Sequence, residues 1–370
     1  MSLNRGLRTA GMMAVLLAVG CADQQAARVD QSIHEWVLVS TLPRSVPGVG
    51  AAAERIAERL EAVSGGRLKV SVHAAGEAPP GMDQPLAPPA VFDAVASGRV
   101  QVGMGTPSMW AERIPAAALF GAVPFGMDSI QFAAWIHHGG GYALWRELYA
   151  GHGLVPFAAG STGAQMAGWF VRPLRTPDDL QGLKMRTTGL GAEVLRRLGV
   201  EVVQTPPGEL LEALRSGELD AAEWKGPYND AALGLERSGA QYYYPGWQEP
   251  DGTLELIVNA EALAALPEDL REVFSVSAMA LQFRIRNEYR HENMRALEQM
   301  RSAGIEPVRI PDAVLEALAR VSRQVLSDAA AEDADFARIY SAYRQSLLHQ
   351  LETAAIGEDA IFGLQGLDDD

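Results

Sequence analysis

The sequence predicts an α/β protein made of two similar lobes that face each other across a cleft. The chain has 370 residues, 48% of them hydrophobic and 21% charged, which is enough to bury a large core in two or more domains. Strand-like and helix-like stretches alternate, an order typical of βαβ units and a mostly parallel sheet. A short helix–glycine–strand pattern occurs twice, from residue 92 and from residue 211, as if each copy closed one lobe.

Composition excludes several classes of protein. Lys and Arg number 31 against 46 Asp and Glu, so the formal net charge is −15. A chain this acidic, with no basic run, is not suited to bind nucleic acid through phosphate contacts. The single cysteine, Cys21, excludes a disulfide framework and clustered Cys–zinc sites. The hydrophobic content excludes a disordered chain.

The N-terminus has the pattern of a secretory signal peptide. Arg5 and Arg8 form a basic segment, and the apolar run Met12–Val19 follows it. This run is far shorter than the ~20 residues that a membrane-spanning helix needs. Small residues come next, so we expect the protein to be exported to the periplasm.

Two interpretations of the cleavage site stay open. The segment Leu17–Cys21 fits a lipobox, in which the mature chain begins at a lipidated Cys21 and is anchored to a membrane. The alternative is an ordinary cut just after Ala22, which discards Cys21. We predict a signal peptide with lipobox over residues 1–21 and a polar tether over residues 22–34.

The first part of the mature chain alternates between strand and helix. Apolar runs predict strands at 36–42 and 68–73, and helical spacing predicts a helix at 49–63 between them. A proline-rich loop follows at 79–89, because proline continues neither kind of element. Helix–glycine–strand patterns such as 92–103 are common in βαβ units, so coincidence is the alternative to a true repeat.

The second part of the chain has clearer boundaries. Thr176-Pro177-Asp178-Asp179 combines an N-cap, a proline at the first helical position and acids in the first turn. From Pro267 to about residue 352 the pattern is almost wholly helical. Between these landmarks we expect a strand at 183–186, a helix at 192–198, a strand at 200–204, a helix at 208–216 and a strand at 219–224.

Familiar catalytic motifs are absent from the sequence. It contains no G-x-S-x-G elbow, H-E-x-x-H, G-K-[ST] loop or C-x-x-C. Gly189-Leu190-Gly191 is a weak nucleotide signal, because Val194 stands where a third glycine belongs. His137-His138 fits the C-terminus of a helix, where the dipole favours cations, better than a metal site.

Polar residues at predicted strand ends are the candidate site. Arg186 ends one strand, and Glu223-Trp224 ends another. Gln165 lies in a glycine-rich turn, and Glu249 follows an aromatic run. In parallel α/β sheets ligands bind beyond the carboxyl ends of strands. An arginine fork holds a carboxylate, and oxygen ligands hold a hard cation, so this set suits a small carboxylate bound with a cation.

Long ordered motifs surround these residues. They are Thr162–Met166 with Gly168–Phe170, Asp179–Arg186, Asp220–Trp224 with Gly226–Asp230, and Tyr243–Trp247 with Glu249-Pro250. With Ala75–Glu77 and Val123–Gly126 upstream, the chain resembles the extracytoplasmic solute receptors (DctP-like) of tripartite ATP-independent periplasmic (TRAP) transporters. It is most similar to the branch that binds 2-oxo acids and related monocarboxylates. The resemblance runs from about Trp36 to about residue 350.

The resemblance implies a fold: a bilobed, type II-like periplasmic-binding-protein clamshell. Two α/β lobes are joined by crossing strands and a long helix, with a helical C-terminal region. Lobe I would comprise residues 35–160 and about 248–290. Lobe II and the C-terminal helices would comprise residues 161–247 and about 291–352.

The resemblance also implies roles for the candidate residues. Arg186 would clamp the substrate carboxylate, and Gln165 would be shared by substrate and metal. Glu223, Glu249 and the Trp224 carbonyl would hold a sodium or calcium ion, with Trp224 and Glu249 also near the substrate. Two glutamates and a substrate carboxylate carry three negative charges, whereas Arg186 carries one positive charge. A cation between the carboxylates would therefore reduce the repulsion among them.

The chain departs from the family pattern on the first lobe. Ser108-Met109-Trp110 stands where the branch has Tyr-Tyr-Trp, and Ala111-Glu112 replaces a Gly-Lys pair. These changes leave the side group of the substrate open. They do not touch the four polar site residues.

Function follows from the resemblance: a binding receptor, not an enzyme, that delivers a small 2-oxo or 2-hydroxy monocarboxylate to TRAP membrane permease subunits. Two alternatives stay open, a periplasmic enzyme for small organic acids on the same scaffold and a receptor that feeds a sensor. The helical pattern after residue 312 permits a homodimer.

Overall fold

The computed structural model describes residues 31–362. The predicted signal peptide and lipobox at 1–21, with Cys21, lie outside the described residues, as does most of the predicted tether at 22–34. From Ile33 to Phe362, the last residue described, the chain forms a single unit. Within residues 31–362, no helix has both the length and the apolar character that a membrane span requires.

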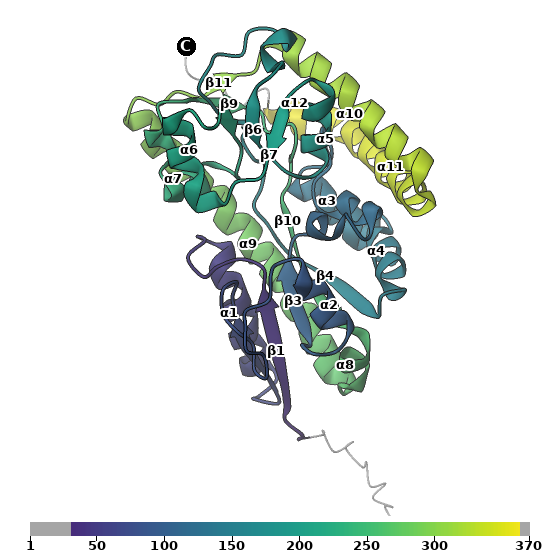
Figure 1. The fold of residues 1–370 in the computed structure, drawn as a ribbon. Helices are drawn as coiled ribbons and strands as arrows, with labels where there is room; N and C mark the ends of the chain where they lie inside the picture. Colours follow the sequence, from purple (N-terminus) through teal and green to yellow (C-terminus); the bar gives the residue numbers. More distant parts are fainter. Residues whose placement is uncertain (1–30, 363–370) are drawn as a thin grey trace, which may run out of the picture. The chain divides into compact units, whose positions relative to one another are not determined.

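Five strands make the first sheet, in the order β2-β1-β3-β10-β4 (Figure 1). The β2-β1-β3 pairs are parallel, and β10 is antiparallel to both of its neighbours. Every residue of β10 is buried, as befits a strand covered on both faces. The bounds are β1 (His34–Ser40), β2 (Leu68–His73), β3 (Val102–Gly105), β4 (Leu154–Ser161) and β10 (Thr253–Asn259).

Helices cover both faces of the first sheet. Trp36, Leu38 and Val102 pack on one face against α1 and α9, whereas Val39 and Ile257 pack on the other against α2, α3, α4 and α11. The helical elements here are η1 (Val49–Ala51), α1 (Ala52–Val63), α2 (Ala90–Ala96), η2 (Pro107–Trp110), η3 (Pro115–Phe120), α3 (Ser129–His138), α4 (Gly141–Ala150) and α8 (Ala260–Ala265).

The second sheet has six strands in the order β11-β9-β5-β8-β6-β7. Phe170 and Tyr243 face α5 and α10, while Trp169 and Tyr242 face α6. The strands are β5 (Gly168–Phe170), β6 (Lys184–Arg186), β7 (Glu201–Val203), β8 (Ala221–Ala222), β9 (Gln241–Tyr244) and β11 (Val308–Arg309). The helical elements are η4 (Pro177–Leu180), α5 (Gly189–Arg197), η5 (Pro207–Glu209), α6 (Leu210–Ser216), α7 (Pro227–Leu233) and η6 (Leu235–Arg237).

The expected mostly parallel arrangement holds for all strands but one in each sheet. In the first sheet β10 runs antiparallel to both of its neighbours, and in the second sheet β5 does. The chain leaves the first sheet after β4, enters the second through β5, and returns to the first as β10. A strand that arrives from the other sheet enters against the direction of its neighbours, so β5 and β10 pair antiparallel. The two copies of the repeated pattern fold alike, as α2 followed by β3 in one sheet and α6 followed by β8 in the other.

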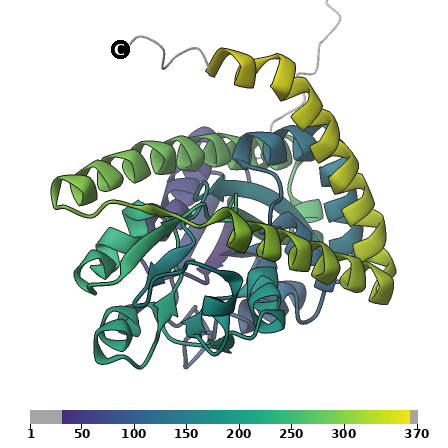
Figure 2. The same ribbon diagram turned by 90° about the horizontal axis from the view of Figure 1, so that it is seen from above.

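The C-terminal region is helical as predicted, apart from residues 303–311, which include β11, and a break at Asp333. Helix α9 (Glu268–Ser302) has 35 residues and is therefore about 50 Å long. It packs on the first sheet and reaches α7, where Asn293 accepts a hydrogen bond from the Tyr228 amide at 3.0 Å (Figure 1). After β11, α10 (Asp312–Glu332) and α11 (Ala334–Ile356) pack against each other and are followed by α12 (Glu358–Phe362) (Figure 2).

Several predicted boundaries shift in ways that shape the site. The strand predicted at 36–42 ends at Ser40, and the strand predicted at 219–224 is only Ala221–Ala222. In both cases the polar residues after the strand leave the sheet. His137-His138 ends α3 before the C-cap Gly139, as the helix-dipole argument predicts.

A buried carboxyl group lies inside the first sheet. Glu255, on β10, is fully buried, and its carboxyl accepts hydrogen bonds from the Trp110 indole and from the Tyr149 hydroxyl. Burial raises the pKa of Glu255 to about 8. The folded protein therefore holds this proton over a pH range in which the unfolded chain has released it.

Because the folded protein retains this proton, we predict that its stability depends on pH. A raised carboxyl pKa means that the free energy of unfolding falls as pH rises from about 5 to about 8, by up to ~1.4 kcal/mol per pH unit. Glu255→Gln should make this decline shallower, because an amide has no proton to lose. Urea unfolding at several pH values measures how the free energy of unfolding changes with pH. The exposed Glu261→Gln should keep the wild-type slope, and an unchanged slope in Glu255→Gln would contradict the prediction.

Candidate functional site

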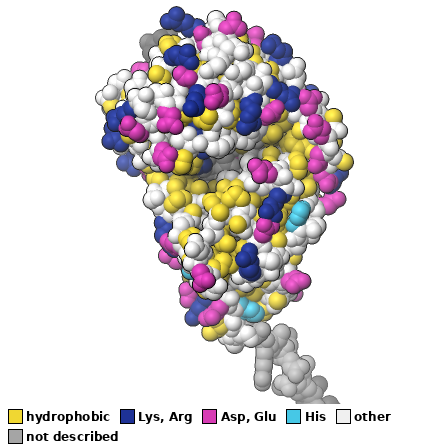
Figure 3. All heavy atoms as spheres, viewed as in Figure 1, with side chains coloured by type: hydrophobic (Ala, Val, Ile, Leu, Met, Phe, Trp, Pro, Cys, Tyr) yellow, Lys and Arg dark blue, Asp and Glu magenta, His cyan; other side chains and the backbone are white. Residues whose placement is uncertain are grey.

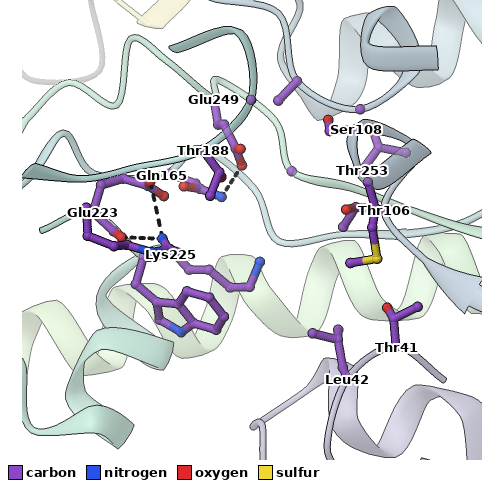
Figure 4. Close-up of a pocket in the computed structure, with 17 residues that line it drawn as sticks. Thr41, Leu42, Thr106, Ser108, Gln165, Thr188, Glu223, Lys225, Glu249 and Thr253 are labelled. Carbon is purple, nitrogen blue, oxygen red and sulfur yellow. Dashed lines mark hydrogen bonds and ion pairs between the residues drawn. The ribbon is translucent and has the colours of Figure 1, made fainter. Parts of the chain in front are cut away.

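A pocket of about 260 Å³ lies where the strand ends of the two sheets meet. Figure 3 shows a hollow in the face it views, and Figure 4 shows the pocket wall. The first-sheet side is lined by Thr41, Leu42, Thr106, Ser108, Met109, Gly121, Ala122, Gly252 and Thr253. The second-sheet side and the connecting segments contribute Gln165, Arg186, Thr188, Gly189, Glu223, Trp224, Lys225 and Glu249.

Arg186 is buried at the end of β6, with 7% of its surface exposed. Its Nη1 donates to the Glu223 carbonyl at 2.6 Å and lies 3.5 Å from the Glu223 carboxylate. Its guanidinium carbon lies 5.1 Å from the centre of the Trp224 ring. The buried Nε has no hydrogen-bond partner among residues 31–362, so the guanidinium keeps a donor for an incoming group.

Glu223 and Trp224 leave the sheet directly after the two-residue strand β8. The Glu223 amide still donates to the Arg186 carbonyl at 3.0 Å, which fixes the point where the chain turns away. The Glu223 side chain is buried, and Trp224 is half-buried against two cations. The strand-end rule thus places both residues in the pocket.

Gln165 and Glu249 come from the two segments that cross between the sheets. The Gln165 amide donates to the Glu249 carbonyl at 3.1 Å, and the Gln165 side-chain amide donates to the Glu249 carboxylate (Figure 4). Nearby, the Thr162 amide donates to the Gly252 carbonyl at 3.0 Å. The Gln165 Oε1 is buried without a partner in the described part of the chain, an orphan acceptor that faces a pocket.

Lys225 is a charged pocket residue that the sequence reasoning missed, as it missed the threonines of the pocket wall. It directly follows Glu223-Trp224, so the strand-end rule places its backbone near the site but does not fix the direction of its side chain. Only 8% of its surface is exposed, and its Nζ lies 5.2 Å from the centre of the Trp224 ring. Figure 4 shows its side chain extending into the pocket. The predicted charge count, with Arg186 as the single positive group, is therefore wrong.

Burial and neighbouring charges shift the pKa values of the ionisable side chains in the pocket. Loss of hydration and the neighbouring Glu223 carboxylate raise the pKa of Glu249 to about 8. Burial also raises the pKa of Glu223, although Arg186 and Lys225 oppose the shift. Burial lowers the pKa of Lys225, opposed chiefly by Glu249. The two carboxyls and two cations are thus coupled within one small volume.

The donor set of the pocket is made of oxygen atoms. Two carboxylates, the Gln165 amide oxygen and the Trp224 backbone carbonyl are the ligand types that hard cations prefer. Within residues 31–362, no group of three or more His, Cys, Asp or Glu is placed to hold a metal ion. A cation here would therefore need the amide and carbonyl oxygens as well as Glu223 and Glu249.

Hydroxyl groups dominate the opposite wall. Thr41, Thr106, Ser108 and Thr253 face the charged cluster across the pocket (Figure 4). The Thr41 hydroxyl is buried without a partner in the described chain. Ser108 and Met109 line the pocket, whereas Trp110 is buried beneath them in the core. This wall can offer hydrogen bonds to a polar group of a ligand.

Comparison with known families decides the class of protein. The model of "Bacterial extracellular solute-binding protein, family 7" (DctP) matches residues 38–333. The chain belongs to this family. The predicted resemblance to TRAP solute receptors is confirmed, and so is the prediction of a periplasmic binding protein that is not an enzyme.

Relatives of this DctP-family chain bind small acids. It is 36% identical over 341 residues to a monocarboxylate 2-oxoacid-binding periplasmic protein of Nostoc sp., an alignment that covers 91% of this chain and 92% of the relative. A TRAP solute-binding protein of Pseudoalteromonas atlantica, solved with sodium and pyruvate, has a TM-score of 0.83 at 30% identity, covering 90% of this chain and 99% of that one.

A second solved structure is equally similar. The TRAP transporter solute-binding protein of Bordetella bronchiseptica has a TM-score of 0.84 at 29% identity, covering 90% of this chain and 97% of that one. It was solved as a mixed-occupancy dimer with calcium and picolinate in one site. These matches confirm the predicted two-lobed periplasmic-binding-protein fold.

Proposed function

We propose that this DctP-family protein binds a small 2-oxo monocarboxylate together with a sodium or calcium ion and delivers it to a TRAP permease. The observation that carries the proposal is a pair of buried groups that line one pocket and have no hydrogen-bond partner within residues 31–362, the Arg186 Nε and the Gln165 Oε1. The named ligands of the relatives, a 2-oxoacid, pyruvate and picolinate, all carry a carboxylate that such a guanidinium can hold.

Each candidate residue takes a distinct part. Arg186 donates to the substrate carboxylate, and Gln165, through Oε1, is shared between substrate and cation. Glu223, Glu249 and the Trp224 carbonyl hold the cation, and Trp224 and Glu249 border the substrate. The cation supplies positive charge and a second anchor for the substrate oxygens.

Closure of two lobes around the pocket would trap the solute. We assign residues 35–160 and about 248–290 to lobe I, and residues 161–247 and about 291–352 to lobe II and the C-terminal helices, of which α11 packs against the first sheet. The pocket walls come from strand ends of both sheets, so a solute between them contacts both lobes at once. Such hinge closure creates a surface that a permease can distinguish from that of the empty protein.

We further propose that Cys21 carries a lipid anchor. The support is the Leu17–Cys21 lipobox after a basic segment and a short apolar run, with the only cysteine of the chain at the required position.

Arg186→Ala should lower the affinity for pyruvate by about 2–5 kcal/mol, because it removes one partner of a buried charge pair. Isothermal titration calorimetry measures the affinity, and circular dichroism checks the fold. Arg172→Ala is the control, since Arg172 is exposed and pairs with Asp220 at 3.2 Å. Wild-type affinity in Arg186→Ala would remove Arg186 from the binding site.

Sodium or calcium should raise the affinity for pyruvate, and pyruvate should raise the affinity for the cation by the same factor. Glu249→Gln should reduce this factor, because it removes one negative ligand. Calorimetric titrations in sodium-free, chelator-treated buffer and in buffer with added cation give the factor. The exposed Glu201→Gln is the control. Equal pyruvate affinity in both buffers would contradict the cation assignment.

Labelled fatty acid should enter the wild-type protein expressed in a bacterium. Cys21→Ser should block the labelling and release the protein into the soluble fraction or leave the precursor unprocessed. Mass spectrometry of the mature N-terminus provides the second measurement. A wild-type chain that begins at Asp23 would contradict the lipid anchor while leaving export intact.

A further inference from the structure

Lys225 places a positive charge inside the pocket without a direct ion-pair partner among residues 31–362. Its ammonium group makes no hydrogen bond or ion pair with any of residues 31–362, although more than nine-tenths of the residue surface is buried. The chain has only three lysines, Lys69, Lys184 and Lys225, so a lysine at this position is not a common feature of its surface. An ammonium group in a largely buried pocket is costly unless nearby anions or a ligand stabilise it.

The backbone on both sides of this side chain is held firmly. The Lys225 amide donates to the Asp230 carboxylate at 3.2 Å, and the Lys225 carbonyl accepts from the Met166 amide at 3.1 Å. Asp230 is itself buried and accepts from Trp169 and from Tyr242. The side chain therefore starts from a rigid point and extends over the Trp224 ring into the pocket.

The charges that act on Lys225 come from several elements. Glu249 on a crossing segment and Glu223 after β8 attract it, Asp230 on α7 attracts it, and Arg186 on β6 repels it. With Lys225 included, the pocket holds two cationic side chains beside its two glutamates before any ion binds. A monocarboxylate then adds one negative charge, which one sodium ion would balance.

We propose that Lys225 acts as an internal counter-ion, so that carboxylate binding depends only weakly on a bound cation. This inference rests on the proposed function and deepens it. Lys225 lowers the negative potential that a cation would otherwise neutralise, and it repels a cation held by Glu223 and Glu249. Both effects reduce the free-energy coupling between cation and substrate.

The experiment compares wild type with Lys225→Met, a variant of similar length without the charge. Pyruvate is titrated by calorimetry in sodium-free, chelator-treated buffer and in buffer with added sodium chloride or calcium chloride at matched ionic strength. The cation should raise wild-type affinity by at most about tenfold, and the factor should be about tenfold or more larger in Lys225→Met. Lys225→Arg, which keeps the charge, should behave like the wild type.

A second measurement needs no organic acid. Without pyruvate, calcium chloride should raise the thermal unfolding midpoint of Lys225→Met more than that of the wild type, because a like charge has left the cation site. Lys225→Gln provides the same test if Lys225→Met does not fold. Equal calcium shifts in wild type and variant would overturn the proposal even if the protein bound no 2-oxo acid at all.

Three outcomes separate the alternatives. An unchanged cation factor for pyruvate in Lys225→Met would overturn the internal counter-ion. An unchanged factor with a selective loss of a 2-oxo dicarboxylate would show instead that Lys225 anchors a second carboxylate of the ligand, which also overturns it. Absence of 2-oxo acid binding by the wild type in every buffer would contradict the proposed function, and the calcium shifts would then decide the role of Lys225 by themselves.

Discussion

The hydrogen bonding between the two crossing segments is the constraint on which the site depends. Residues 162–166 and 246–252 run between the sheets and bond to each other, through the Thr162 amide to Gly252 and the Gln165 amide to Glu249. A Cβ on Gly246 would overlap the Gln165 carbonyl, so this close approach requires glycine. The pairing sets Gln165 beside Glu249 although they are 84 positions apart in sequence.

Buried charge is the second constraint. The carboxyl groups and the cationic side chains of the pocket lie close enough for the ionisation of each to depend on the others. Glu223 and Glu249 lie near each other out of solvent, and dehydration raises the pKa of both carboxyls. Arg186 and Lys225 oppose these shifts from the strand ends of the same sheet. A cluster of this kind responds to any added charge, which explains why an anionic solute and a cation should influence each other's binding.

Sequence patterns predicted the elements whose signals are local. The strand at 68–73 has the predicted bounds, and the helix predicted at 49–63 is a 3-10 turn followed by α1. The strand predicted at 219–224 is only two residues long, because it pairs with β5 and β6 over Ala221 and Ala222 alone. The one antiparallel strand in each sheet, β10 and β5, escaped prediction for a related reason, since its direction follows from which sheet the chain has just left.

The sequence alone determined the family, the two-lobed α/β fold and the residues at strand ends, because motifs around Arg186, Gln165 and Glu223 are long and ordered. The tertiary structure decided the charge balance of the pocket. Lys225 follows Trp224 in the chain, and no local pattern shows whether its side chain turns to solvent or into the cleft. That direction is set by the bonds of its backbone to Asp230 and Met166, contacts that form only when the crossing segment and α7 come together.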